Sequence, residues 1–178
     1  MSRALFLDRD GVINEDRGYV FEMKDFVFIS GIFELIKKAY DLNMKIFVIT
    51  NQAGIGRGFY NEEDFLELNK WMCQKFKEIG TPINKVYFCP THPNHGLGDY
   101  KKVDNFRKAA PGMILQARDE FDIDLSSSVL VGDKPSDIIA GNRANVGQNI
   151  LLSDSLVDEL SSYSYKVVQS LDEVIPFL

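Results

Sequence analysis

Acidic and polar side chains follow three separate apolar runs of this 178-residue chain. In chain order they are Asp8-Arg9-Asp10, Thr50-Asn51-Gln52 and Gly132-Asp133. Each preceding run is short and apolar and is typical of a buried strand. In an open sheet of parallel strands, ligands bind in a crevice at the carboxyl ends of the strands. The spacing therefore predicts that all three groups line one crevice.

The acidic residues of this crevice have a spacing that suits a hard metal ion. Asp8 and Asp10 lie two residues apart where a strand ends, and Gly11 permits a tight turn beside them. Two close carboxylates repel each other, so either one pKa rises or a cation neutralises them. Asp133 adds a third oxygen donor, and three such donors favour Mg²⁺ over a softer metal. A turn cap at Asp8 and Asp10 is the simpler alternative, but it leaves the third acidic strand end unexplained.

Strands and helices alternate along the chain, which predicts right-handed βαβ units. Strands are predicted at 3–7, 45–50, 86–88, 128–131 and 148–152, and helices at 31–42, 61–79, 111–121 and 135–144. The helix from Asn61 is predicted to bury Phe65, Leu68, Met72, Phe76 and Ile79, and the glycines at 54, 56 and 58 predict a loop before it. A helix–strand–helix pattern is predicted from Asp154 to the end.

The expected fold is α/β, a doubly wound parallel sheet that forms one domain over residues 1–178, with no large cap domain. Cys89–Ala110 shows no periodicity, and a loop of this length is usually functional or mobile. We expect the loops 12–29, 51–60 and 89–110 to cover the site in place of a cap.

Composition excludes several classes of protein. Hydrophobic residues make up 45% and charged residues 26%, as in ordinary globular domains, and the formal net charge is −6. A net negative charge disfavours nucleic-acid binding, because binding requires cations that neutralise the phosphates. Cys73 and Cys89 predict reduced thiols, and no apolar run approaches the ~20 residues of a membrane span or resembles a signal peptide. We therefore expect a cytoplasmic monomer that acts on a small molecule, with no nucleic-acid or membrane partner.

Four motifs in order resemble those of the haloacid-dehalogenase-like (HAD) phosphatases. They are Asp8-Arg9-Asp10-Gly11, Thr50, Lys108 in Arg107-Lys108, and the acidic run Gly132 to Asp137. Each motif is weak alone, whereas the ordered set is specific and spans about three quarters of the chain. Within this group, the stretches FLDRDGVIN, VITNQAGIGRG and VGDKPSD resemble the branch of the heptose bisphosphate phosphatases, and histidinol-phosphate phosphatases share much of the pattern.

The resemblance implies a catalytic role for four residues. Asp8 would be the nucleophile that forms an aspartyl phosphate, and Asp10 the general acid and then the base. Thr50 and Lys108 would stabilise charge on the phosphoryl oxygens. Mg²⁺ would be held by Asp8, the Asp10 carbonyl and Asp133, while Asp137 fits the first turn of a helix better than direct ligation.

The resemblance also implies contacts with a phosphorylated sugar. These fall on Asp16, Arg17, Gly18, Tyr19, Asn51, Gln52, Ala53 and Arg107. Arg107 could bind a second phosphate through two parallel hydrogen bonds. Arg57 is a further candidate, and a solvated loop arginine is an equally good interpretation of it.

Members of this branch typically hold a structural zinc through Cys-x-His and Cys-x-Cys, and this chain departs from that pattern. The corresponding stretches here are Cys89-Pro90-Thr91 and Asp104-Asn105-Phe106, so one cysteine remains. A single thiolate does not make a tetrahedral site. We expect a zinc-free loop held by packing of Tyr100 and Phe106. A replacement metal site of Cys89, His92, His95 and Asp104 is the alternative.

The leading functional prediction is a Mg²⁺-dependent phosphatase that removes the C7 phosphate of a heptose 1,7-bisphosphate, and histidinol phosphate is the alternative substrate. A signalling receiver domain also combines clustered aspartates with a lysine, but it lacks an acid/base equivalent to Asp10 and needs a shorter chain. A catalytically inactive relative is disfavoured because every catalytic position that can be placed is intact.

Overall fold

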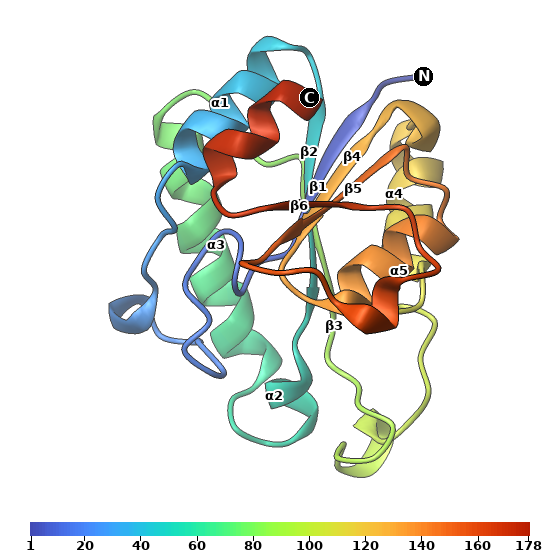
Figure 1. The fold of residues 1–178 in the computed structure, drawn as a ribbon. Coiled ribbons are helices and arrows are strands. Elements are labelled where there is room, and N and C mark those ends of the chain that lie inside the picture. Colours follow the sequence, from blue (N-terminus) through green and yellow to red (C-terminus); the bar gives the residue numbers. More distant parts are fainter.

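One six-stranded parallel sheet organises the chain, and the computed structural model describes all of residues 1–178 (Figure 1). The strands are β1 (Ala4–Leu7), β2 (Lys45–Asn51), β3 (Lys85–Cys89), β4 (Val129–Gly132), β5 (Gln148–Leu152) and β6 (Lys166–Val168). Their order is β3-β2-β1-β4-β5-β6, so the chain extends the sheet on one side of β1 and then on the other. The predicted doubly wound α/β fold is confirmed.

Helices cover both faces of the sheet. They are α1 (Ile32–Asp41), α2 (Ala53–Gly56), α3 (Glu62–Glu78), α4 (Gly112–Phe121) and α5 (Pro135–Arg143), with short 3₁₀ turns at Met23–Asp25, Gly98–Tyr100, Leu125–Ser127, Asp158–Leu160 and Leu171–Phe177. Figure 1 shows α1, α3 and the C-terminal turn on one face and α4 and α5 on the other. Alternation along β1 serves both layers, because Leu5 and Leu7 pack with α1 and α3 whereas Ala4 and Phe6 pack with α4 and α5.

The start of α3 follows the sequence prediction. The side chain of Asn61 accepts a hydrogen bond from the Asp64 backbone at 2.9 Å, and the Asp64 carboxylate accepts one from the Asn61 backbone at 2.9 Å. This capping box satisfies two amide groups that the helix leaves free. The predicted core face is confirmed except at Ile79, which lies at the C-cap and is exposed because the helix has ended there.

Two predicted segments differ from the structure. The glycine-rich stretch that was expected to be a loop contains the one-turn helix α2, where the glycines permit close packing. A Cβ at Gly54 would lie 2.3 Å from Tyr60, and one at Gly56 would lie 2.4 Å from the Pro90 carbonyl. The C-terminal segment forms 3₁₀ turns around β6 rather than two α-helices, and Pro176 lacks the amide that a regular helix needs.

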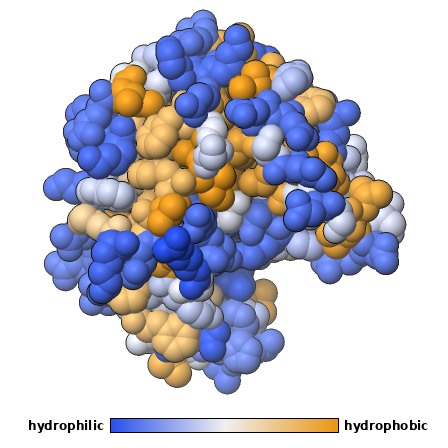
Figure 2. All heavy atoms as spheres, turned by 60° about the vertical axis from the view of Figure 1, so that its left-hand side comes forward, coloured by the Kyte–Doolittle hydropathy of each residue, from blue (hydrophilic) through white to orange (hydrophobic).

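The outer surface is mixed in polarity. Figure 2 shows a largely hydrophilic face on which hydrophobic atoms form scattered patches. Among the helices, none combines the length and the hydropathy that a bilayer crossing requires.

Replacement of Leu68 by alanine tests the inner face of α3. Leu68 is buried against the sheet, whereas Leu66 on the same helix is half exposed. We expect Leu68→Ala to lower the free energy of unfolding by about 2–5 kcal/mol, because it leaves a cavity, and Leu66→Ala to change it by about 0.5 kcal/mol or less. Urea unfolding followed by circular dichroism measures both. Equal losses in the two variants would contradict the burial described here.

Candidate active site

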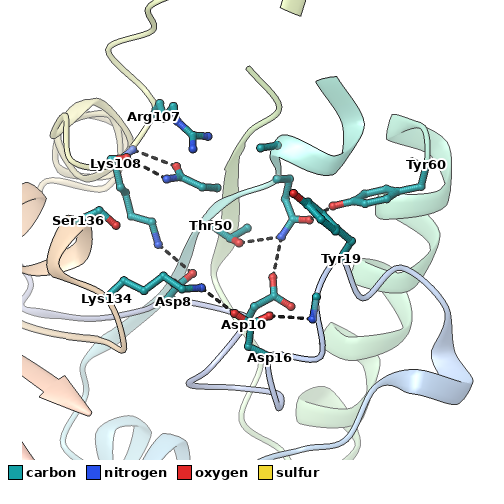
Figure 3. A pocket seen from close by; sticks show the side chains of 14 residues that line it. Asp8, Asp10, Asp16, Tyr19, Thr50, Tyr60, Arg107, Lys108, Lys134 and Ser136 are labelled. Carbon is teal, nitrogen blue, oxygen red and sulfur yellow. Dashed lines mark hydrogen bonds and ion pairs between the residues drawn. The ribbon is translucent and has the colours of Figure 1, made fainter. Parts of the chain in front are cut away.

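The three polar strand ends meet in one pocket beside the position where the strand order reverses, between β1 and β4. Its volume is about 450 Å³, and Figure 3 shows the side chains that line it. The lining residues are Asp8, Asp10, Asp16, Gly18, Tyr19, Thr50, Asn51, Gln52, Ala53, Tyr60, Arg107, Lys108, Lys134 and Ser136. Eleven of these were predicted from the sequence, and β1 and β2 position most of the catalytic candidates among them.

A buried lysine lies among the carboxylates at the base of the pocket. Lys108 Nζ is 2.8 Å from Asp8 Oδ1 and 2.6 Å from Asp137 Oδ1, and it donates a hydrogen bond to the Ile49 carbonyl at 2.8 Å. Three oxygen atoms thus surround the ammonium, two as ion-pair partners and one as a hydrogen-bond acceptor. Asp137 lies in the first turn of α5, as predicted, and also accepts from the Lys134 backbone at 3.0 Å.

The charge of this cluster is not balanced by protein groups. Oxygen atoms of Asp8, Asp133 and Asp137 lie within 4.8 Å of one another. Lys108 is buried among them, and Lys134 Nζ lies 3.7 Å from Asp133 Oδ2 at the edge of the cluster. Burial, with repulsion from Asp137 and Asp133, raises the pKa of Asp8 to about 8 although Lys108 opposes the rise. Burial likewise raises the pKa of Asp133 to about 6. With Asp16, the second partner of Lys134, four ionised carboxylates and two ammonium groups leave two negative charges, which a divalent cation would neutralise.

Two further observations show that the residues fit a hard divalent cation. Asp133 Oδ1 is fully buried and has no hydrogen-bond partner, which is costly unless a cation or water binds it. Gly11 adopts a φ of +91°, and a Cβ at this position would lie 2.2 Å from Asp133 Oδ2. The glycine therefore provides the space in which Asp133 approaches β1. The backbone hydrogen bonds of this turn leave the Asp10 carbonyl without a donor.

The Asp8 carboxylate has one oxygen that is held and one that is free. Oδ1 accepts a hydrogen bond from the Arg9 backbone at 2.7 Å and lies 2.8 Å from Lys108 Nζ. No protein group donates to Oδ2. Such an arrangement fixes the side chain and leaves one oxygen available for attack on an electrophile.

Asp10 is held by three donors from different parts of the chain. Its Oδ1 accepts from Arg9 Nη2 at 2.9 Å and from Asn14 Nδ2 at 3.0 Å, and its Oδ2 accepts from Gln52 Nε2 at 3.1 Å. Its side chain therefore points toward β2 rather than into the Asp8–Asp133–Asp137 cluster, and only its backbone carbonyl is available to a cation there.

Thr50 and Asn51 have different surroundings at the end of β2. Thr50 Oγ1 accepts from Gln52 Nε2 at 2.8 Å, so its own hydroxyl proton is free to donate toward the pocket. The Asn51 amide bonds both backbone groups of Lys108, at 2.9 Å and 3.0 Å. Asn51, predicted as a substrate contact, therefore lines the pocket and also anchors the backbone of the buried lysine.

Two loops meet at the mouth of the pocket. Lys134 Nζ pairs with Asp16 Oδ2 at 2.8 Å, and Asp16 Oδ1 accepts from the Gly18 backbone. Burial opposes the charge of Lys134, but Asp16 and Asp133 outweigh it and raise the pKa of this lysine. Arg107 donates from Nη1 to the Thr91 carbonyl at 3.0 Å, which leaves most of its guanidinium N–H groups for a ligand.

The structure does not bring two predicted substrate residues into the pocket lining. Arg17 is exposed and pairs with Glu15 at 2.7 Å. Arg57 lies over the rings of Phe59 and Tyr19 and donates to the Tyr19 hydroxyl. Both side chains satisfy their charge locally. Sequence analysis assigned Arg57 by its glycine-rich surroundings, and it could not foresee the aromatic partners.

Three lining residues were not predicted as site residues: Tyr60, Lys134 and Ser136. Lys134 and Ser136 belong to the acidic motif that begins at Gly132, so the motif itself carried a signal for them. No sequence signal indicated Tyr60, because it precedes α3 and only the tertiary fold brings it into the pocket lining.

The loop from Cys89 to Ala110 is held by polar and aromatic contacts. Cys89 Sγ lies 3.1 Å from Thr91 Oγ1, which donates to Asp104 Oδ2 at 3.3 Å. Tyr100 packs against the Ile55 cluster, as predicted. Phe106 is 38% exposed, so its predicted packing is wrong. The rings of His92 and His95 contact each other at a tilt of 42°. The only group of three metal-ligand side chains within 4.8 Å is the aspartate cluster.

Comparisons with known proteins agree with this site. A family model described as polynucleotide kinase 3 phosphatase matches residues 5–158. The chain is 55% identical to D-glycero-alpha-D-manno-heptose-1,7-bisphosphate 7-phosphatase of Burkholderia mallei over 99% of this chain and 94% of the relative. It is 41% identical to D-glycero-beta-D-manno-heptose-1,7-bisphosphate 7-phosphatase of Vibrio cholerae, over 98% and 95%.

Solved structures show the same fold. A HAD-like protein of Mesorhizobium loti matches with a TM-score of 0.89 and 30% identity, over 99% of this chain and 85% of that one. D,D-heptose 1,7-bisphosphate phosphatase of B. bronchiseptica, complexed with magnesium and phosphate, matches with a TM-score of 0.79 and 22% identity, over 98% and 96%. Sequence identity, fold and the ordered aspartate motifs agree, and the chain belongs to the HAD phosphatases, within the family of D-glycero-D-manno-heptose-1,7-bisphosphate 7-phosphatases.

Proposed function

We propose that this phosphatase removes the C7 phosphate of D-glycero-D-manno-heptose 1,7-bisphosphate in a Mg²⁺-dependent reaction through an aspartyl phosphate. The observation that carries the proposal is the Asp8 carboxylate, which is fixed by Lys108 through one oxygen and free at the other, at the base of a pocket lined by cations. The 55% identity with a relative named for this substrate supports the sugar.

In the first step, Asp8 Oδ2 attacks phosphorus, and the bond between phosphorus and the sugar oxygen breaks. Asp10 donates a proton to the leaving oxygen. In the second step Asp10 takes a proton from water, the water oxygen attacks phosphorus, and cleavage of the bond to Asp8 releases phosphate. Thr50 and Lys108 donate hydrogen bonds to the phosphoryl oxygens in both steps.

Asp8, the Asp10 carbonyl and Asp133 would hold Mg²⁺, and their fit rests on the two uncompensated charges and the orphaned Asp133 oxygen. When bound, the cation neutralises charge on the phosphoryl group and on the carboxylates. Asp137 acts through Lys108, which it holds beside Asp8.

Arg107 and Lys134 are the cations at the pocket mouth that suit the second phosphate of a bisphosphate. Asp16, Gly18, Tyr19, Asn51, Gln52 and Ala53 form the walls around the sugar. Histidinol phosphate, the alternative substrate, has one phosphate and would leave the remaining N–H groups of Arg107 without an anionic partner.

We further propose that the enzyme is a cytoplasmic monomer that serves nucleotide-activated heptose synthesis for lipopolysaccharide or other surface glycans. Its two cysteines are unpaired thiols, which suits a reducing compartment. The net charge of −6 disfavours a nucleic-acid substrate.

Asp8→Asn tests the covalent mechanism. The amide is a poor nucleophile, so we expect phosphate release to fall by at least about 10³-fold, with the fold retained. Malachite-green assays would compare both anomers of the heptose bisphosphate with histidinol phosphate, using wild-type protein as the reference. Equal or better turnover of histidinol phosphate would overturn the proposed substrate, and activity surviving in Asp8→Asn would overturn the mechanism.

Asp133→Asn tests the cation site without an activity assay. Removal of one crowded carboxylate relieves repulsion, so the metal-free melting temperature should stay the same or rise. Saturating Mg²⁺ should raise the wild-type value by several degrees, since a ligand at 100 times its Kd adds about 2.7 kcal/mol, and this rise should vanish in the variant. Asp119→Asn on the exposed surface of α4 is the matched control and should keep the rise. A full Mg²⁺ effect in Asp133→Asn would place the cation elsewhere.

We propose that the loop from Cys89 to Ala110 folds without zinc. The Cys89–Thr91–Asp104 contacts occupy three of the four positions that hold zinc in the branch. Elemental analysis of protein purified without chelators should find less than about 0.1 zinc per chain, because one thiolate with a carboxylate makes an incomplete tetrahedral site. Stoichiometric zinc that remains after dialysis would contradict the proposal.

A further inference from the structure

A buried hydrogen-bond chain connects a tyrosine to two of the proposed catalytic groups (Figure 3). The Tyr60 hydroxyl donates to Gln52 Oε1 at 2.5 Å. Gln52 Nε2 donates to Asp10 Oδ2 at 3.1 Å and to Thr50 Oγ1 at 2.8 Å. One amide thus joins the proposed acid/base to the proposed phosphoryl donor, and it uses both of its N–H groups to do so.

The chemistry of the partners fixes the direction of this chain. An ionised carboxylate accepts hydrogen bonds only, so the NH₂ side of the Gln52 amide must face Asp10. The amide oxygen then faces Tyr60, which must donate its proton. Without the Tyr60 hydroxyl, the buried amide oxygen would have no partner, and the amide would lose the contact that opposes rotation toward other orientations.

Tyr60 is itself rigid. Its ring is buried and stacks on Phe21 with centroids 5.1 Å apart and planes 9° apart. Gly54 provides the space for the ring, since a Cβ there would lie 2.3 Å from Tyr60 Cε1. A side chain held on two sides defines the position of its hydroxyl closely, and the hydroxyl in turn defines the position of Gln52.

Gln52 reaches the one oxygen of Asp10 that still has a free acceptor position. Arg9 and Asn14 occupy both acceptor positions of Oδ1, whereas Gln52 alone binds Oδ2. Each carboxylate oxygen accepts about two hydrogen bonds. The remaining position of Oδ2 is therefore the one through which Asp10 can exchange a proton with a leaving group.

We propose that Tyr60 and Gln52 are positioning residues that direct Asp10 Oδ2 and Thr50 toward the leaving group, a role for Gln52 that is additional to its place in the pocket wall. The inference rests on the proposed acid/base role of Asp10. It does not depend on which phosphate ester is the natural substrate.

Tyr60→Phe removes only the hydroxyl, and Tyr100→Phe is the matched control. Tyr100 donates to Glu62 at 2.9 Å and lies outside the pocket. The assay compares two substrates: the alkyl phosphate that wild-type enzyme hydrolyses fastest, and p-nitrophenyl phosphate, whose leaving group needs little protonation. The ratio kcat/KM covers the steps up to departure of the leaving group, so misplacement of the acid lowers it for the alkyl ester.

For Tyr60→Phe we expect kcat/KM to fall about tenfold for the alkyl phosphate and less than about threefold for p-nitrophenyl phosphate, mainly through kcat. Tyr100→Phe should change neither. In a Gln52→Met background, Tyr60→Phe should have no further effect, because the hydroxyl acts only through the amide. Equal losses on both substrates, or an undiminished effect in that background, would overturn the proposal.

Nuclear magnetic resonance gives a readout that needs no turnover. The Gln52 side-chain amide signals, assigned by their disappearance in Gln52→Met, should exchange slowly with solvent in wild type and quickly in Tyr60→Phe. Unchanged protection would contradict the positioning role. If only the proposed heptose substrate is wrong, the expected changes in kcat/KM on the two test substrates and in the Gln52 amide signals still hold. The two proposals can therefore be contradicted separately.

Discussion

The structure of the site depends on one electrostatic constraint, the crowding of three carboxylates beside the buried Lys108. Asp8, Asp133 and Asp137 arrive from β1, β4 and α5, and the ammonium compensates only part of their charge. Such a cluster is costly in a protein interior unless the geometry is closely controlled. The fold provides that control through the adjacent parallel strands β1 and β4, the left-handed turn at Gly11, and the Asn51 amide that anchors the Lys108 backbone. The local cost in stability is consistent with the proposed binding of a cation and a phosphoryl group at this cluster.

A second set of contacts keeps Asp10, the proposed proton-transfer group, apart from this cluster. Asp10 is only two residues from Asp8, yet its carboxylate points toward β2, where Arg9, Asn14 and Gln52 receive it. The turn after β1 accounts for the separation, because residues at i and i+2 would face the same side if the strand continued. Two aspartates with the same chemistry thereby obtain different surroundings and different roles.

Sequence predicted most of the framework because its signals are local. Buried strands, the Asn61 cap and the order of the acidic motifs depend on residues close in the chain, and all were found where expected. The errors concern partners that only the tertiary fold creates. Arg57 lies over the rings of Tyr19 and Phe59. Tyr60 packs beside Gly54 and lines the pocket, and the aromatic side chain of Phe106 is exposed. At the C-terminus, Pro176 favoured 3₁₀ turns over the predicted helix.

The three contacts of Lys108 have a consequence for the end of the catalytic cycle. Its ammonium lies against three protein oxygen atoms before any ligand arrives, as ion pairs with Asp8 and Asp137 and as a hydrogen bond to the Ile49 carbonyl. In the proposed mechanism a phosphoryl group competes with these oxygens and exchanges with one of them. The exchange also runs in reverse, since the same acceptors compete for the lysine once inorganic phosphate has formed. In the proposed mechanism the protein therefore competes with inorganic phosphate for Lys108, and this limits how tightly the product can be retained.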